Sequence, residues 1–374
     1  MTFRAERRGT FRAERRGTFR AERRGAFRAE VRDQIAKWRR DGVFEPRSDS
    51  WLTGYDEDFS RRLGARGWIG LTWRGRGFAD RFVLTEELLR AGAPVAAHWI
   101  ADRQIGPAIA RLGSAALKQA LLPGIEAGDV RFCLGMSEPD AGSDLASVRT
   151  RAVRTDGGWL LDGQKVWSSH AHRATHAYVL ARTSTGEHKH RGLTEFVLDM
   201  SAPGVTARQI PDMRGPGHFC EVFFDGAFVP DSAVLGSVGD GWGQVTGQLA
   251  FERGGPERVL STYPLLALTL AAAGPADAGR VGELVARLTA LRRLGKQVAA
   301  RMDAGEAPIG AAATLKMLGN RFEVDVIEVA RSVPGVPRAA IDDAVLAAPG
   351  FSLRGGTTEV LGVVIAREAM GAVG

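Results

Sequence analysis

The sequence predicts an α+β protein in which two helical regions flank a region of short strands. From Phe27 to about Gly128 apolar residues recur every three or four positions, and the same pattern returns from Gly241 onward, which is the spacing of a buried helix face. Between about Val130 and Leu235 the period changes to two, which indicates strands. Because no helical pattern separates these strands, we expect a small antiparallel barrel or sandwich.

These changes of period divide the 374 residues into four parts. We expect a tail at 1–25, an N-terminal helical domain at 26–129, a middle β domain at 130–238 and a C-terminal helical bundle at 239–374. Hydrophobic residues make up 44% and charged residues 25% of the chain, which is typical of a globular protein.

The tail consists of three copies of the octapeptide Thr-Phe-Arg-Ala-Glu-Arg-Arg-Gly over residues 2–25. Each copy carries three arginines and one glutamate, so the tail contributes +6 of the net charge of +7. The basic charge is therefore no evidence of a nucleic-acid-binding domain. A tail that contacts RNA or a membrane surface stays an alternative to a solvated one. A fourth, divergent copy at 26–30 begins the first predicted helix, and the upstream copies are expected to extend that helix or to be disordered.

The N-terminal domain is predicted to be helical throughout. Its first helix has apolar residues at helical spacing from Phe27 to Trp38 and ends at Gly42. Ser114 is expected to cap the last helix, and Pro123 to end it. The other expected helices are Phe59–Arg66, Phe82–Arg90, Ala101–Leu112 and Ser114–Leu122.

The middle domain is organised around residues 136–169. Asp156-Gly157 stands between two alternating runs and predicts a tight hairpin. The second run ends in Trp167 and Ser169, an indole beside hydroxyls, which suits a flat ligand rich in heteroatoms. A core tryptophan beside solvated serines is the alternative. Further strands are expected at Ala177–Thr183, Leu193–Met200, Val205–Ile210 and Glu221–Phe228.

The C-terminal region is predicted to be an antiparallel helical bundle, because four segments carry apolar stripes. They are Gly243–Leu260, Arg280–Ala304, Pro308–Arg331 and a last helix from Thr357 to Met370 that Gly371 closes.

The two cysteines, Cys133 and Cys220, lie in apolar segments and are expected to be buried thiols. The histidines at 170, 172 and 176 cluster in one loop and those at 188 and 190 in another, but a metal site requires a tighter set with a carboxylate or thiolate partner. Solvated loop histidines are expected, and a substrate or flavin contact by His170 and His172 is favoured over a metal site. No run of about eighteen apolar residues predicts a membrane span, and the first residues do not resemble a secretory signal. A cytoplasmic protein is the simplest expectation.

Two motifs carry a family resemblance. Ser-Glu-Pro-x-Ala-Gly-Ser-Asp at 137–144, followed by Asp-Gly-Gln-Lys-x-Trp-Ser-Ser at 162–169, resembles the middle domain of the acyl-CoA dehydrogenase family. The resemblance extends from about Phe27 to the C-terminus. It implies a helical domain, an antiparallel β-barrel and a four-helix bundle. It also implies FAD as cofactor, an acyl-CoA as substrate, and an electron-transfer flavoprotein or a similar acceptor as partner.

The resemblance assigns roles to residues of the middle domain. Met136 and Ser137 would face the flavin, Trp167 would cover the isoalloxazine, and Ser169 would bond near its reactive edge. Ser143 would contact the CoA arm.

The resemblance also locates the catalytic base, a carboxylate that removes the α-proton. The usual position, just before a Gly-Thr pair, holds Gly355 here, whose N–H is still able to donate to the thioester carbonyl. Some members carry the base on the first helix of the C-terminal domain, where this chain has Glu252 followed by Arg253, a candidate substrate contact. A surface Glu–Arg pair is the alternative interpretation.

Two residues near the C-terminus complete the set. Thr357 would contact the flavin or its pyrophosphate at a helix N-terminus. Glu359 is a second candidate for cofactor contact and the fallback for the base, with an acidic helix cap as its alternative interpretation.

Three departures from the family pattern bear on assembly and on the acyl pocket. The loop Arg74–Gly77 is short, Leu268–Pro275 lacks the Arg followed by Phe-Gly, and Val333–Pro337 stands near the place of a Gly-Gly-x-Gly segment. The last two losses resemble the branch in which unlike subunits assemble, a branch seen among bulky, steroid-type acyl-CoA substrates.

Three functions therefore stay open: an acyl-CoA dehydrogenase with Glu252 as base, a non-catalytic or half-site subunit of a heteromeric dehydrogenase, and a flavin-dependent oxidase or monooxygenase. A homo-oligomer and a heteromer are both open.

Overall fold

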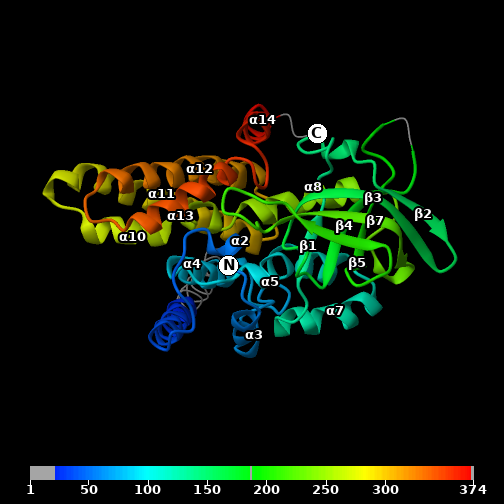
Figure 1. Cartoon of the computed structure of the whole chain (residues 1–374), viewed down its shortest axis with the longest axis horizontal. Helices are drawn as coiled ribbons and strands as arrows, with labels where there is room; N and C mark the ends of the chain where they lie inside the picture. Colours follow the sequence, from blue (N-terminus) through cyan, green and yellow to red (C-terminus); the bar gives the residue numbers. More distant parts are fainter. Residues whose placement is uncertain (1–21, 186–187, 372–374) are drawn as a thin grey trace, which may run out of the picture.

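The computed structural model describes residues 22–185 and 188–371, with the backbone alone for 249–252. Helices come first, a sheet follows and helices return, as the periodicity predicts (Figure 1). The octapeptide copies lie outside the described residues up to residue 21.

The N-terminal helices begin with a helix over residues 22–40. The next elements are α2 (Ser50–Thr53), α3 (Glu57–Ala65), α4 (Phe78–Arg90), α5 (Ala96–Ile100), the π-helix η1 (Ala101–Ile105), α6 (Gly106–Leu112) and α7 (Ala115–Ala127). The predicted cap is confirmed, because the Ser114 hydroxyl accepts from the N–H of Leu117 at 3.1 Å. The predicted stop at Pro123 is wrong: α7 continues through it to Gly128, whose φ of 84° provides the left-handed cap. A proline removes one backbone donor but does not end a helix that the rest of the chain supports.

The middle region forms one eight-stranded sheet. Its strands are β1 (Phe132–Gly135), β2 (Arg151–Thr155), β3 (Gly158–Ser169), β4 (His176–Arg182), β5 (Leu193–Asp199), β6 (Val205–Gln209), β7 (Phe219–Pro230) and β8 (Val234–Leu235). Their order is β6-β7-β3-β2-β4-β5-β8, with β1 added at β4. The hairpin is confirmed: Thr155 pairs with Gly158, and Gly157 has a φ of 74°. Most pairs are antiparallel, but β4 runs parallel to β1 and β2, which the period-two pattern did not indicate.

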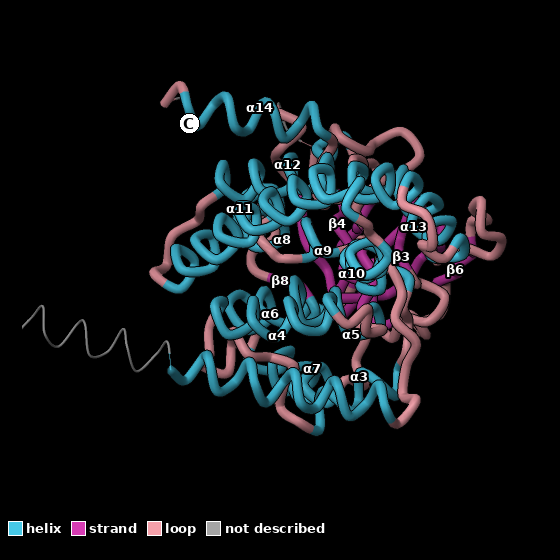
Figure 2. Tube along the Cα trace, turned by 90° about the vertical axis from the view of Figure 1, so that its left-hand side faces the viewer, coloured by secondary structure: helices cyan, strands magenta, loops and turns pink. Residues whose placement is uncertain are grey.

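The C-terminal elements are α8 (Gly241–Arg253), α9 (Glu257–Leu260), α10 (Tyr263–Ala272), α11 (Ala278–Asp303), α12 (Ile309–Ser332), α13 (Arg338–Phe351) and α14 (Thr358–Ala369). In Figure 2 the long helices α11 and α12 lie side by side, above the N-terminal helices α3, α4 and α7. The predicted first helix of the bundle is split into α8 and α9 at Gly254-Gly255-Pro256. The helices α10 and α13 were not predicted.

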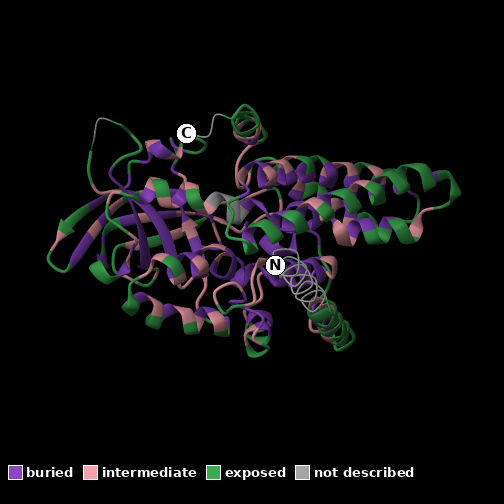
Figure 3. Ribbon diagram, turned by 180° about the vertical axis from the view of Figure 1, so that it is seen from behind, coloured by how far each residue is buried: buried purple, intermediate pink, exposed green. Residues whose placement is uncertain are grey.

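One hydrophobic core joins the three regions. It contains Trp99 of the N-terminal helices, Phe196 of the sheet and Phe322 of the bundle. Figure 3 shows buried residues from the sheet to the base of the bundle, whereas the far end of the bundle is mostly exposed. Both thiols are buried and free, as predicted. None of the described helices has the length and apolar character of a membrane span.

Candidate active site

The end of β3 exposes Trp167. The pairing of β3 with β7 is irregular between Lys165 and Ser168, and Trp167 has a left-handed φ of 62°. Its side chain is 57% exposed and contacts Phe219 edge-on at 5.6 Å. A large apolar residue with a positive φ is uncommon and marks a backbone that the surroundings hold in place. The alternative of a core tryptophan is therefore wrong.

Met136 and Ser137 lie beside this strand end. The carbonyl of Ser137 accepts from the N–H of Val166 at 2.9 Å, and the Ser168 hydroxyl donates to the carbonyl of Leu134 at 2.8 Å. No described residue is hydrogen-bonded to the hydroxyl of Ser137 or of Ser169. The exposed indole and two available hydroxyls are thus collected at one end of the sheet.

A buried ion pair supports the turn that follows β1. Lys165 Nζ lies 2.8 Å from Glu138 Oε1 and donates to the carbonyl of Met136 at 3.1 Å. Burial lowers the pKa of Lys165 to about 8. Burial tends to raise the pKa of Glu138, but the Lys165 ammonium and the N–H groups of Arg149 and Thr150 outweigh it and lower that pKa. The sequence did not predict this pair, because the two residues are 27 positions apart and each lies in a polar segment where an exposed side chain is expected.

Ser143 is exposed in the turn between β1 and β2. The neighbouring Asp144 pairs with Lys189 at 2.7 Å, and both side chains are more than half exposed. Ser143 is accessible to a ligand, and its contact with a CoA arm stays a prediction.

The loop after β3 is anchored to the N-terminal helices. His170 Nε2 lies 2.6 Å from the carbonyl oxygen of Leu52, and its ring lies 4.4 Å from that of Tyr55. Burial lowers the pKa of His170 to about 4, so the imidazole is neutral at pH 7 and its Nε2–H donates to Leu52. The loop therefore has a fixed position.

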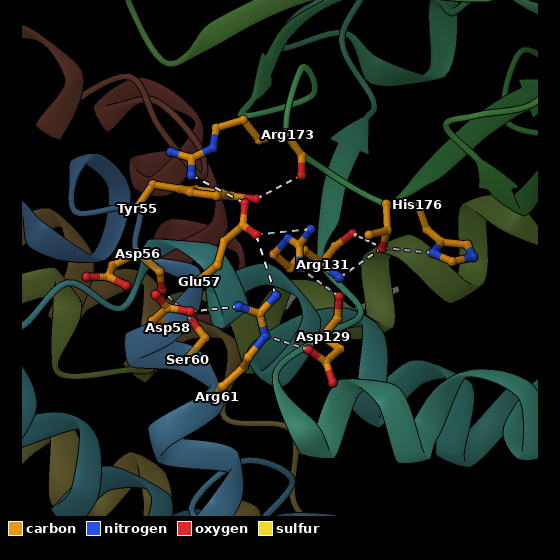
Figure 4. Close-up of polar contacts among 11 residues, drawn as sticks. Tyr55, Asp56, Glu57, Asp58, Ser60, Arg61, Asp129, Arg131, Arg173 and His176 are labelled. Atoms are coloured by element: carbon orange, nitrogen blue, oxygen red, sulfur yellow. Dashed lines mark hydrogen bonds and ion pairs between the residues drawn. The ribbon is translucent and has the colours of Figure 1, made fainter.

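Figure 4 shows a second anchor of the same loop. The Glu57 carboxylate contacts Arg173 at 3.3 Å and Arg131 at 3.5 Å, and the Tyr55 hydroxyl donates to the carbonyl of Arg173 at 3.1 Å. These contacts join the start of α3 to Arg131, just before β1, and to Arg173, in the loop after β3.

The second group of predicted residues meets where α8 ends. Arg253 is buried, and its Nε donates to the carbonyl of Gly355 at 3.0 Å. Lys316 of α12 is fully buried and donates to the carbonyl of Gly356 at 2.9 Å. Glu252 precedes Arg253 in α8, but its side chain lies outside the described residues.

The backbone at Gly355 and Gly356 adopts a conformation that favours glycine. Gly355 and Gly356 have φ values of 66° and 104°, which disfavour any residue with a Cβ. Neither N–H donates to an acceptor among the described residues. Thr357 caps α14, its hydroxyl accepting from the N–H of Val360 at 3.4 Å. The loop thus presents donors at the N-terminus of a helix.

Glu359 lies exposed in the first turn of α14. Its own backbone N–H and the Thr357 hydroxyl lower the pKa of its carboxyl. Both observations describe an acidic helix cap.

The two groups of residues lie on neighbouring parts of the fold. His218, just before β7, lies with its ring 5.4 Å from that of His170. Burial, His170 and the charge on Arg354 lower the pKa of His218 to about 3. The buried Nε2 of His218 has no hydrogen-bond partner among the described residues, and the ring lies 4.1 Å from that of Phe219. An unsatisfied buried nitrogen beside the Trp167 platform is consistent with a polar ligand at this place.

Comparison with known families agrees with this architecture. The acyl-CoA dehydrogenase N-terminal, middle and C-terminal domain models match residues 14–129, 133–227 and 269–370 respectively.

Curated relatives and solved structures show the same similarity. The chain is 34% identical to acyl-CoA dehydrogenase IpdE1 of Mycobacterium tuberculosis, covering 84% of this chain and 87% of that protein. It is also 34% identical to FadE34 of the same organism, over 81% of this chain but only 44% of the length of FadE34. A steroid ACAD, Tcur3481-Tcur3483, superposes with a TM-score of 0.81 at 25% identity, covering 95% of this chain and 97% of that one. The ChsE4-ChsE5 complex from M. tuberculosis gives a TM-score of 0.79 at 25% identity, covering 93% and 97%.

Proposed function

Since the chain belongs to the acyl-CoA dehydrogenase family, whose members are FAD-dependent oxidoreductases, we propose that it oxidises the Cα–Cβ bond of an acyl-CoA thioester. The observation that carries the proposal is that one fold presents both an exposed Trp167 (the Trp167 platform) and a pair of glycines, Gly355-Gly356 (the glycine loop), whose carbonyls Arg253 and Lys316 hold.

The residues at the end of β3 fit an isoalloxazine. Trp167 offers a flat exposed face, and Ser137 and Ser169 offer hydroxyls that no described residue engages. Thr357 opens a helix of twelve residues, whose N-terminus favours a phosphate. Bound FAD would supply the acceptor for the β-hydride of the substrate.

We propose Glu252 as the base that removes the α-proton. Its neighbour Arg253 reaches the glycine loop, so this end of α8 adjoins the proposed thioester site. Gly355 has no carboxylate, and Glu359 is an exposed cap. The N–H of Gly355 would donate to the thioester carbonyl, which stabilises the negative charge that develops there as the proton leaves. Because Arg253 is buried against Gly355, holding the loop is its first role, and a substrate contact stays a prediction.

The similar proteins support a bulky substrate and a partner subunit. One solved relative is titled a steroid ACAD and another is the ChsE4-ChsE5 complex. We therefore propose a steroid-type acyl-CoA, assembly with a related chain, and transfer of electrons to an electron-transfer flavoprotein or a similar acceptor. The missing carboxylate at Gly355 keeps a half-site subunit as the second candidate.

The visible absorption spectrum of the purified protein, before and after a panel of acyl-CoAs, tests the proposal. We expect bound flavin that bleaches anaerobically with some thioester, and a loss of bleaching in Glu252→Gln but not in the matched Glu359→Gln. A protein that stays colourless until a related subunit is co-expressed would favour the half-site. Equal bleaching in Glu252→Gln would exclude that residue as the base. If one O2 is consumed for each acyl-CoA that is oxidised, the protein is an oxidase and not a dehydrogenase.

A further inference from the structure

Asp49 is a buried aspartate in an uncommon conformation. It lies just before α2 with φ 54° and ψ 28°, and it is 2% exposed. Its N–H donates to the carbonyl of Ser261 at 2.7 Å. Aspartate tolerates the left-handed region better than most residues, but a buried carboxylate requires a partner.

That partner is Arg354, 305 residues away in the sequence. Nη1 of Arg354 lies 2.9 Å from Oδ2 of Asp49, and Nη2 lies 3.1 Å from Oδ1, a bidentate arrangement. The Nε of Arg354 donates to the carbonyl of Gly350 at 3.1 Å, and its guanidinium lies 4.9 Å from the Trp51 ring. These contacts hold the guanidinium in one orientation, and the Arg354 side chain is only 15% exposed.

Arg354 directly precedes the glycine loop. Arg253 and Lys316 hold the carbonyls of Gly355 and Gly356. The peptide plane that carries the Gly355 N–H begins at Arg354, so its orientation depends on how Arg354 is held. Two consecutive glycines have wide conformational freedom, so their N–H groups point in one direction only if the flanking residues are fixed.

The segment that carries Asp49 also holds the other part of the site. The carbonyl of Leu52 accepts a hydrogen bond from His170, and the Tyr55 hydroxyl donates to the carbonyl of Arg173. Residues 49–57 therefore contact both the loop after the Trp167 platform and the residue before Gly355 (Figure 4 for the Tyr55 side).

From this geometry we infer that Asp49 is a positioning residue of the reaction. Through Arg354 it fixes the N–H of Gly355 against the thioester carbonyl, and its segment keeps that donor in register with the Trp167 platform. It touches neither substrate nor cofactor. The inference rests on the proposed function, because it assigns a purpose to the direction of the Gly355 N–H.

Asp49→Asn is the decisive variant, since asparagine keeps the shape and tolerates the left-handed backbone but removes the charge. The matched control is Asp342→Asn, which makes the same change in the exposed pair of Asp342 with Arg338 on α13. In Asp49→Asn we expect kcat to fall about 10- to 100-fold, as for a misplaced donor, with KM and FAD content changed by less than about threefold. Arg354→Lys, which keeps the charge but not the bidentate fork, is expected to lie between the two.

Two further readouts separate positioning from general damage. The wild type is expected to bind a non-oxidisable acyl-CoA thioester more tightly than the thioether in which the carbonyl is replaced by a methylene, and Asp49→Asn should lose that preference. The N–H of Arg354 donates to the carbonyl of Gly350 at 3.0 Å. Hydrogen exchange of this amide in the FAD-loaded protein without substrate should become faster in Asp49→Asn and stay unchanged in Asp342→Asn.

Unchanged kcat and exchange in Asp49→Asn would overturn the inference, as would equal losses in the control. Weakened binding of thioester and thioether alike would reduce Asp49 to a structural residue. If no acyl-CoA reduces the wild-type flavin, the proposed function fails. The exchange experiment still tests whether Asp49 holds Arg354 in place.

Discussion

At the residue scale, the candidate site depends on charges that are buried in pairs. Lys165 with Glu138 and Arg354 with Asp49 each hold a turn that the site uses. Such pairs contribute little net stability over an apolar replacement, but they are costly to break on one side. Their value here is the direction they impose on the backbone around Met136 and Gly355.

Removing one member of the first pair is therefore expected to destabilise the protein strongly. Lys165→Met leaves Glu138 buried without its cation and should cost about 3–5 kcal/mol in the free energy of unfolding. The double variant Glu138→Gln/Lys165→Met should recover more than half of that loss. Urea denaturation measures both, and a loss in the double variant equal to the sum of the single losses would contradict the pairing.

A second buried group predicts a pH dependence. Burial raises the pKa of Glu323 to about 8, with the negative Asp49 adding to the effect and hydrogen bonding from Ser261 opposing it. The folded state therefore binds a proton that the unfolded state releases near 4.5. The stability associated with this proton is present at low pH and is lost as the pH rises from about 4.5 through about 8.

Glu323→Gln removes this titration while keeping an acceptor for Ser261. We expect the variant to gain stability over the wild type as the pH rises, by on the order of 1–3 kcal/mol at pH 8. Melting temperatures from pH 5 to pH 9 provide the measurement. A constant difference across that range would show that Glu323 is already ionised in the folded protein.

At the element scale, two helical glycines differ in whether there is space for a side chain. A Cβ at Gly319 of α12 would overlap the carbonyl oxygen of Arg258, whereas at Gly362 of α14 nothing lies within 4 Å. The first glycine lets α12 pack against α9; the second only lowers helix propensity.

Gly319→Ala is accordingly expected to destabilise the protein by about 2–4 kcal/mol or to prevent folding, because a backbone atom has to move. Gly362→Ala should stabilise it by about 0.5–1 kcal/mol. Thermal denaturation of the pair is the check; similar effects in both variants would contradict the close approach of α12 and α9.

At the scale of the whole molecule, the three regions share one core. The cluster that contains Trp99, Phe196 and Phe322 is continuous, and the 49–57 segment contacts the other two regions. We expect one unfolding transition, with the same midpoint by far-ultraviolet circular dichroism and by tryptophan fluorescence. Two separated midpoints would show that the regions unfold independently. The predicted domain boundaries stay predictions in either case.

Local patterns in the sequence determined the order of helices and strands, the Asp156-Gly157 hairpin and the cap at Ser114, because periodicity and turn chemistry act over a few residues. The helices α10 and α13 escaped prediction. The α10 segment is apolar on every side and shows no periodic stripe, and α13 carries Pro349 near its end. Each helix places part of one face in the shared core, through Leu265 and Leu266 of α10 and through Ala344 and Phe351 of α13, and no local pattern records this packing.

The motifs also determined the family and the residue types of the candidate site. Only the tertiary structure decided that Trp167 is exposed, that Lys165 pairs with Glu138, and that Asp49 holds Arg354 across 305 residues. A pairing over such a distance leaves no trace in spacing or periodicity. It arises when the folded chain brings two charges into a dry interior, where each is stable only beside the other.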